Sequence, residues 1–115
     1  MEQLNKVELR GIVGSVRTQK INEVTMARFC VATNYAYKDR EGYAVIDTSW
    51  HNVTAWEGRN IQNLEKLSKG AKVHLFGRIR YQTYTGADGV DRTSTDILVS
   101  KLEILDQEEP MQYEA

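Results

Sequence analysis

The sequence is poor in three features that define large classes of protein: it holds one cysteine, one proline and no long apolar run. Cys30 alone cannot form an internal disulfide, and no spacing of Cys and His residues resembles a zinc site. No apolar stretch approaches the roughly 20 residues that cross a membrane, and no basic start precedes an apolar segment at the N-terminus. We therefore expect a cytoplasmic protein with no disulfide, metal, cofactor, signal peptide or membrane contact.

The composition is that of one small globular domain with an uneven charge distribution. The chain has 115 residues, of which 41% are hydrophobic and 27% charged, and its net charge is −1. The last ten positions hold no Lys or Arg but four of the sixteen acidic residues, so residues 1–105 carry 15 basic and 12 acidic side chains. This balance permits a basic groove. We expect one domain over 1–105 and a short, disordered acidic tail over 106–115.

Alternation of apolar and polar residues predicts five strands, because side chains two apart share one face of a half-buried strand. Gly11 and Gly14 interrupt the first strand, where a bulge or bend lets a long strand close a small barrel. Residues 18–23 are expected to form a turn and 34–43 a loop. The expected strands cover about residues 4–17, 24–33, 44–56, 71–84 and 92–99, with 101–105 prolonging the last or packing beside it.

The stretch from residue 59 to residue 69 has a different period. Ile61, Leu64 and Leu67 recur every three residues, and Gly70 follows as a stop signal. This spacing predicts a short amphipathic helix. The resulting order is β-β-β-α-β-β, which indicates an all-β fold: a five-stranded OB-fold barrel with one short helix between strands 3 and 4.

Both tryptophans lie in one predicted strand, within the segment Ser-Trp-His-Asn-Val-Thr-Ala-Trp at 49–56. Alternation puts Trp50 and Trp56 on the same face as Asn52 and Thr54. Because polar residues share this face, the two indoles are not ordinary core residues, and exposed indoles can stack on unpaired bases. Packing under a loop or against another subunit is the alternative, and the strand alone leaves both open.

Two further segments carry aromatic residues outside the expected core. In the loop, Tyr35 and Tyr37 are interleaved with Lys38. This arrangement suits binding of a nucleic-acid strand, although tyrosines in a hairpin loop also pack locally. On the fourth strand, His74 and Phe76 occupy the face opposite the apolar positions.

Several short segments, in order from Asn5 to about Leu105, resemble the bacterial single-stranded DNA-binding protein family. None of these segments is specific alone, but their occurrence together, in this order around one helix, is specific. The resemblance implies sequence-nonspecific binding of single-stranded DNA in replication, recombination or repair, and a homo-oligomer, a tetramer before a dimer. The segments are Asn5-Lys6-Val7-x-Leu-x-Gly11-x-x-Gly14, Phe29-x-Val-Ala-Thr33, Trp50-His51-x-Val53, Lys69-Gly70-x-x-Val73, Gly77-Arg-Ile-Arg80 and Asp88-Gly-x-Asp-Arg92.

In that family a few aromatic residues on the barrel surface stack with bases. The matching positions, Tyr37, Trp50, Trp56 and Tyr84, all remain aromatic here. The resemblance also places His51 at a subunit contact and puts His74 and Phe76 on a face that the family uses for subunit packing, so we assign His74 and Phe76 to an oligomer interface rather than to DNA. Three positions where relatives often carry Arg or Lys are neutral here (Asn52, Gln82, Thr83), which predicts weaker electrostatic binding and a flatter salt dependence. The candidate DNA-binding residues are the aromatics Tyr35, Tyr37, Trp50, Trp56 and Tyr84 and the basic residues Lys6, Arg17, Lys38, Arg59, Arg78 and Arg80.

The C-terminal end departs from the family. Its members usually continue through a linker rich in Gly, Pro and Gln to an acidic tip closed by apolar residues, which recruits replication and repair partners. This sequence runs about ten residues past its last strand without either feature, so we expect a short form of the family, and the departure argues against recruitment through the tail. A tailless replication accessory of the primosomal type or an OB fold that binds protein is the alternative. No convergent acid/base or nucleophilic groups suggest an enzyme.

Overall fold

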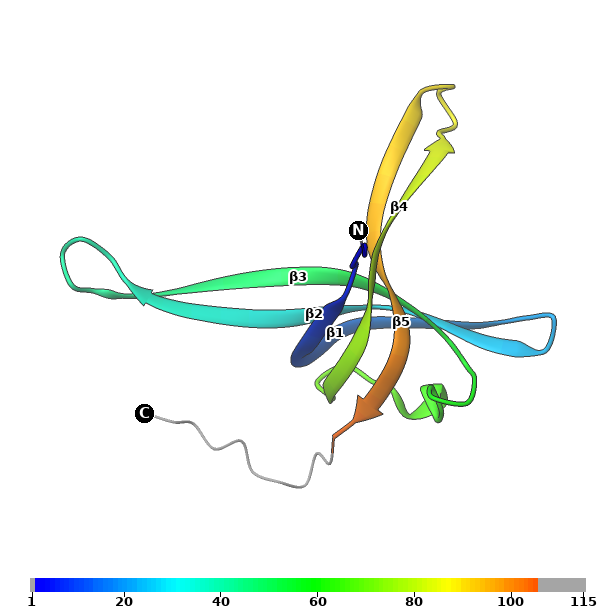
Figure 1. The fold of residues 1–115 in the computed structure, drawn as a ribbon, viewed down its shortest axis with the longest axis horizontal. Coiled ribbons are helices and arrows are strands. Elements are labelled where there is room, and N and C mark those ends of the chain that lie inside the picture. The colour runs from blue at the N-terminus through cyan, green and yellow to red at the C-terminus, as the bar shows by residue number, and fades with distance from the viewer. Residues whose placement is uncertain (1, 106–115) are drawn as a thin grey trace.

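The computed structural model describes residues 2–105 and forms a closed barrel of five strands (Figure 1). The expected acidic tail over 106–115 lies outside the described residues. Among residues 2–105, no helix is long and apolar enough to cross a membrane. The elements are β1 (Val7–Ile21), β2 (Val24–Lys38), β3 (Ala44–Trp56), the 3₁₀ helix η1 (Leu64–Lys66), β4 (Lys72–Thr85) and β5 (Asp91–Ile104).

The strand order around the barrel is β1-β2-β3-β5-β4, and β1 pairs with β4 to close it. All pairs are antiparallel except β3–β5, which are parallel and meet only at Val53↔Ile97 and Thr54↔Leu98. This topology confirms the predicted all-β, five-stranded OB-fold barrel.

The core fills the barrel and is closed at one end by the segment around η1. Phe29 from β2, Val53 from β3 and Leu75 from β4 are at most 4% exposed. The alternation in the sequence therefore reports the inner face correctly over the barrel. The remaining members of the cluster are Val13, Ala27, Val31, Ala55, Ile61, Leu64, Leu67, Ala71, Val73, Ile97, Val99 and Leu102.

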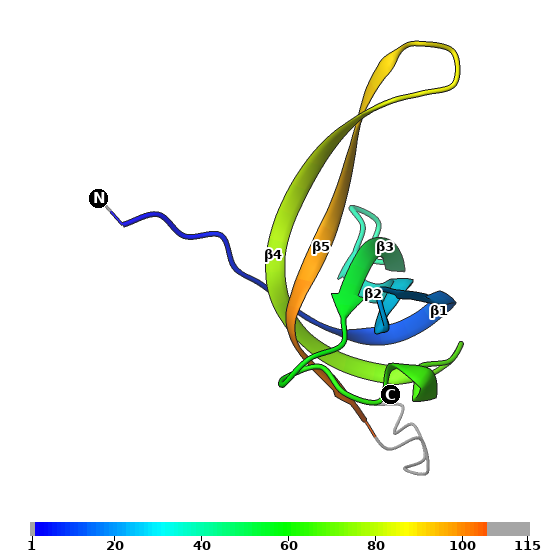
Figure 2. The ribbon, with the colours of Figure 1, turned by 90° about the vertical axis from the view of Figure 1, so that its right-hand side faces the viewer.

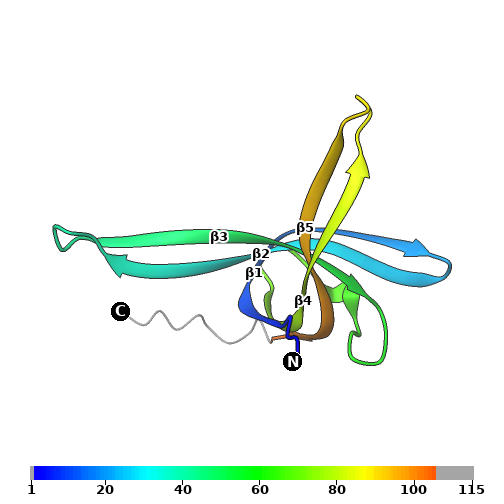
Figure 3. The same ribbon diagram turned by 45° about the horizontal axis from the view of Figure 1, so that its top comes forward.

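Three hairpins extend the strands beyond the barrel. The β1–β2 and β2–β3 hairpins point in opposite directions, and the β4–β5 hairpin rises between them (Figures 1 and 3). The strands are consequently longer than the pattern predicts: residues 18–21 and 34–38 are paired strand, and the expected loop shrinks to 39–43. At the barrel end, β5 runs on to Ile104, which is the prolongation expected for 101–105. Both sides of a projecting two-stranded ribbon face solvent, so no apolar alternation marks it in the sequence.

A single short helical turn separates β3 from β4, as predicted, but η1 covers only Leu64–Lys66 of the expected 59–69. Asn63 takes a left-handed conformation with φ 61°, which prevents a longer right-handed helix from forming through it. Ile61, Leu64 and Leu67 are nevertheless at most 6% exposed. The period of three therefore marks three anchors of an irregular segment that covers the barrel end.

Candidate nucleic-acid interface

Both indoles lie outside the core, on one face of the β1-β2-β3 layer. The strand register places Trp50 opposite Ala32, Trp56 opposite Met26, and residue 54 opposite Arg28. Directly paired residues share a face of the sheet, so this outer face carries both tryptophans and the Arg28 guanidinium. Trp50 is 60% exposed and Trp56 39%, which agrees with the alternation argument.

A groove of about 690 Å³ lies between this face and the β4–β5 hairpin; we call it the β3 groove. Figure 2 shows the hairpin standing beside β2 and β3. Trp50 and Trp56 are on the same face of β3 as its floor, one on either side of it along the strand and about 20 Å apart at the rise of an extended chain. The groove is lined by Ser15, Arg17, Arg28, Phe29, Cys30, Asn52, Val53, Thr54, Gln82, Thr83, Tyr84, Ser94, Thr95 and Asp96.

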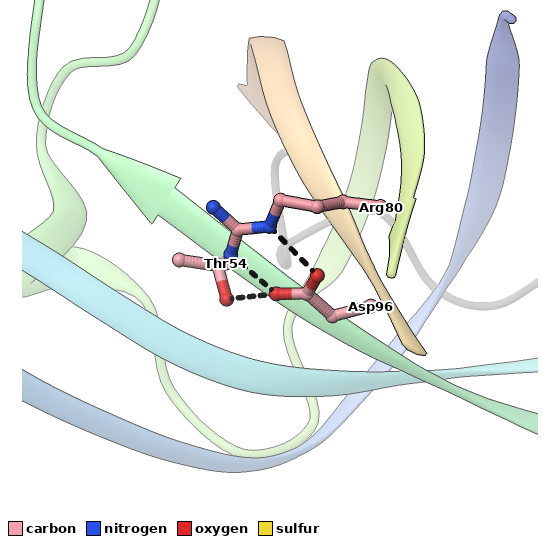
Figure 4. A network of polar contacts seen from close by, with 3 residues as sticks. All are labelled: Thr54, Arg80 and Asp96. Atoms are coloured by element: carbon pink, nitrogen blue, oxygen red, sulfur yellow. Dashed lines mark hydrogen bonds and ion pairs between the residues drawn. The ribbon is translucent and has the colours of Figure 1, made fainter. Parts of the chain in front are cut away.

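A network of polar contacts joins three strands at one side of the groove (Figure 4). Arg80 Nε donates to Asp96 Oδ1 at 3.0 Å and Nη2 to Oδ2 at 2.7 Å, while Thr54 Oγ1 donates to Oδ2 at 2.7 Å. The bonds from Arg80 lower the pKa of Asp96 most; partial burial opposes the shift, and Thr54 and the charge of Arg28 add to it. The network holds the β4–β5 hairpin to β3 at the place where β3 and β5 share only two backbone pairs.

The structure brings together only part of the predicted basic set. Of the six candidate cations, Arg17 alone lines the β3 groove, and Arg80 is engaged by Asp96. Lys6 and Arg78 line a different hollow of about 410 Å³ beside Phe76, and Arg59 lines a third. Lys38 is at the far end of β2, on the projecting β2–β3 hairpin.

The aromatic candidates also divide between surfaces. Tyr84 lines the groove from the β4–β5 hairpin and is 50% exposed. Tyr35 and Tyr37 stack on each other with ring centroids 6.1 Å apart, and they pair with residues 47 and 45. Because 45 and 47 alternate with Trp50 along β3, this tyrosine pair lies on the other face of the hairpin. A strand of DNA that contacts both surfaces must pass around the hairpin.

Two contributors to the groove were missed from sequence: Arg28 and Asp96. Their roles depend on which residue lies across from each in the barrel, and one chain read in order does not show this. Cys30 also lines the groove, and its hydrogen bonds with the hydroxyl and the amide of Ser15 lower the pKa of its thiol. Among residues 2–105, no group of three or more His, Cys, Asp or Glu is placed to hold a metal ion.

The residues assigned to an oligomer interface lie apart from the groove. His74 and Phe76 are neighbours on β4, with ring centroids 4.9 Å apart, and His74 Nε2 is 2.6 Å from Glu8 Oε2. The ammonium groups of Lys6 and Lys101 each lie 5.9 Å from the centre of the Phe76 ring. These residues form what we call the Phe76 face. His51 is on the β2–β3 hairpin, where its Nε2 is 2.9 Å from the Thr33 hydroxyl.

The N-terminal arm is fixed to β4 by a side chain. Asn5 Nδ2 donates to the Ile79 carbonyl at 2.8 Å, and Asn5 Oδ1 accepts from the Ile79 amide at 2.9 Å. The amide side chain therefore makes the two bonds that a strand residue would make, which gives a physical reason for Asn at the start of the first motif.

A closed five-stranded barrel with exposed tryptophans flanking a polar groove defines an OB-fold protein with an open ligand-binding face. The model of the "Single-strand binding protein family" matches residues 4–105, and the chain belongs to this family, as the motifs predicted.

Among curated relatives, the Single-stranded DNA-binding protein of Xanthomonas campestris pv. campestris is 38% identical over 104 residues, covering 89% of this chain and 60% of the relative. The protein of that name from Neisseria meningitidis serogroup A is 38% identical over 107 residues, with 89% and 60% covered. The chain therefore spans about 60% of the length of these relatives.

Solved structures agree with the barrel. A structure described as "Plasmodium falciparum SSB complex with ssDNA" superimposes with a TM-score of 0.76 at 26% identity, covering 92% of this chain and 98% of that one. The wild-type single-stranded DNA binding protein from Thermus aquaticus has a TM-score of 0.72 at 20% identity, with 91% and 52% covered, and supports the fold alone.

Proposed function

We propose that this protein binds single-stranded DNA without sequence preference, with the strand laid along the β3 groove. The observation that carries the proposal is the pair of exposed indoles, Trp50 and Trp56, on one face outside the core and on either side of the groove floor. Every base has a π-face, so stacking on an indole contributes about 1–3 kcal/mol per base with little regard to sequence.

The groove supplies the complementary contacts to the backbone. Arg17 and Arg28 face each other across β1 and β2 and line the groove, where they can neutralise phosphates. The β3 floor is polar but neutral at Asn52 and Thr54, and Asp96 is already bound to Arg80. The proposed mode is therefore stacking with few ionic contacts.

The relatives support this proposal. Those from Xanthomonas and Neisseria are named single-stranded DNA-binding proteins, and the Plasmodium structure is described as a complex with ssDNA. On this basis we propose a cytoplasmic binding protein, not an enzyme, that acts in replication, recombination or repair. The proposed function does not include recruitment of other proteins through the C-terminal residues.

Titration with oligo(dT), followed by intrinsic tryptophan fluorescence, tests the proposal. Both indoles are on the proposed binding face, so saturable quenching is expected. Trp50→Phe and Trp56→Phe, measured separately, assign the signal to each ring. A protein that neither changes its fluorescence nor retains labelled oligo(dT) in a mobility-shift assay contradicts the proposal and favours a protein-interaction module.

We also propose that the protein forms a homotetramer, with a dimer as the second possibility. Phe76, half-buried at the surface with His74 against it, supports an interface on the Phe76 face. Light scattering at micromolar concentration measures the mass directly, and a monomer contradicts this part.

A further inference from the structure

The indole of Trp50 occupies the space that a side chain at position 14 would need. A Cβ placed on Gly14 would lie 2.4 Å from Cζ3 and 3.1 Å from Cη2 of Trp50, and 2.8 Å from Cys30 Sγ. Carbon atoms in non-bonded contact prefer about 3.5–4.0 Å. Any residue larger than glycine at this position must therefore displace the ring or the strand.

Backbone conformation does not explain this glycine. The glycines with positive φ among the described residues are Gly42, Gly70 and Gly89, and Gly14 is not one of them. Gly14 lies where the β1–β2 register shifts, between Val13 and Val16, but a bulge with ordinary φ accepts other residues. Position 14 must lack a side chain to leave room for the Trp50 indole, which makes the shortest contact, and for the Cys30 thiol.

The ring reaches Gly14 by crossing a whole strand. Trp50 is on β3 and Gly14 on β1, with β2 between them. The β2 residue directly opposite Trp50 is Ala32, and Cys30 is the next residue on that face. We call these three small residues, Gly14, Cys30 and Ala32, the Trp50 seat.

We propose that Gly14 is a positioning residue for DNA binding: it lets the Trp50 indole rest on β1, so that the ring is held in place before a base arrives. The proposal rests on the proposed function, because it assigns Trp50 as a stacking platform. A ring that is already ordered loses little freedom on binding. An unseated ring has to be immobilised by the DNA, at a cost of about two- to tenfold in affinity.

Gly14→Ala in the full-length protein is the primary test. We expect oligo(dT) affinity to fall about two- to tenfold. In a Trp56→Phe background, where Trp50 is the only tryptophan, Gly14→Ala should also lower the steady-state fluorescence anisotropy of the free protein. Gly58→Ala is the matched control, because its Cβ would be 4.0 Å from the nearest atom, and it should change neither quantity.

Two combinations separate positioning from a general structural effect. Trp50→Phe shortens the ring, so Gly14→Ala should cost no further affinity in that background. Gly14→Ala combined with Cys30→Ala should keep the loss, which assigns it to the indole rather than to the thiol. If Gly14→Ala costs the same affinity with and without the Trp50→Phe substitution, the proposal is overturned.

A second variant covers the case in which Gly14→Ala does not fold. Ala32→Val adds bulk beside the indole from β2 and leaves every β1 residue unsubstituted, and it should reproduce the lower affinity and the lower anisotropy. Unchanged affinity and anisotropy in Ala32→Val contradict the seat. If the wild-type protein fails to bind oligo(dT), the proposed function fails, whereas wild-type binding with additive double mutants refutes only the role of Gly14.

Discussion

The β3 groove and the Phe76 face use the same kinds of residue in opposite ways. Around the groove, the tryptophans are 60% and 39% exposed and Arg28 shares their face of the sheet. On the Phe76 face the ring is half-buried, Lys6 and Lys101 lie near it, and His74 is paired with Glu8. The difference shows that surfaces with both aromatic and basic residues can differ in how much ring area and charge they leave available to a ligand. Open ring faces beside available cations are what base stacking requires.

The largest expected effect separates the core from the groove. Phe29→Ala removes a ring that is 4% exposed and should cost about 3–5 kcal/mol of the free energy of unfolding, measured by urea denaturation. Trp50→Ala and Trp56→Ala should each change stability far less. A tryptophan variant that unfolds like Phe29→Ala would place its indole in the core and move the DNA path elsewhere.

The next effect compares the two surfaces directly. Trp50→Ala or Trp56→Ala should weaken oligo(dT) binding by about 1–3 kcal/mol, which is roughly 5- to 150-fold. Phe76→Ala should leave binding of a short oligonucleotide within about twofold, because its ring lies outside the groove, while it weakens self-association in light scattering. The comparison breaks down if Phe76→Ala lowers DNA affinity as much as the tryptophan variants do.

The Arg80–Asp96 pair sharpens the comparison between the two surfaces, because Arg80 is a cation near the groove whose charge is already paired with a carboxylate. Removing these charged hydrogen bonds by Asp96→Asn should cost about 1–3 kcal/mol of stability at pH 7. The lowered pKa of Asp96 means that this stabilisation is complete above the unfolded-state pKa and is lost as pH falls through the folded-state pKa. The difference in denaturation midpoint between wild type and Asp96→Asn should therefore be largest at pH 7 and narrow as the pH is lowered into the acid range. A gap of constant size would contradict the linkage.

A smaller effect distinguishes cations inside and outside the groove. Arg28→Gln should weaken binding and reduce the salt slope, d log K/d log[salt], by about 0.7, the value for one contact to a single strand. Arg59→Gln is the matched control, because Arg59 lines a separate hollow, and its slope should stay at the wild-type value. Titrations at several NaCl concentrations measure both slopes.

The smallest expected effect concerns the acidic tail, residues 106–115. Its four carboxylates can compete with phosphates for the cations of the groove. Truncation after Leu105 should leave oligo(dT) affinity unchanged or slightly higher, measured at low salt where the competition is strongest. A folded but weaker-binding truncation would give the tail a direct part in binding.

The sequence predicts the barrel body better than its hairpins. Over residues 24–33 one side of β2 is buried, so apolar residues recur every second position. Over 34–38 every residue is exposed, and nothing in the sequence marks the strand. The anchors of the η1 segment were likewise identified, but the left-handed Asn63 that interrupts the helix carries no signal in the spacing.

The same distinction holds for the candidate site. Alternation alone placed Trp50 and Trp56 outside the core, because polar Asn52 and Thr54 share their face, although Thr54 itself is only 6% exposed and is hydrogen-bonded to Asp96. It could not show that Arg80 pairs with Asp96, since the pairing depends on the β4–β5 register. The contact between Gly14 and Trp50 spans three strands and is equally invisible without the barrel. A local sequence pattern predicts which face of a strand a residue occupies, whereas predicting contacts between strands requires knowing how the strands are paired.

The two seams of the barrel are unequal, and this has a consequence for how it forms. The β1-β2-β3 meander and the β4–β5 hairpin join through β1–β4 over residues 7–12 of β1, but through β3–β5 at only two backbone pairs. Both seams close long loops, but the β3–β5 seam has only two backbone pairs to offset the closure entropy, whereas the β1–β4 seam has six. Native-state hydrogen exchange should accordingly show the amides of this seam opening before those of β1–β4, and Asp96→Asn should speed that opening selectively. The Asp96 carboxylate, through its bonds to Thr54 of β3 and Arg80 of β4, would then be what keeps the β3–β5 side of the barrel closed.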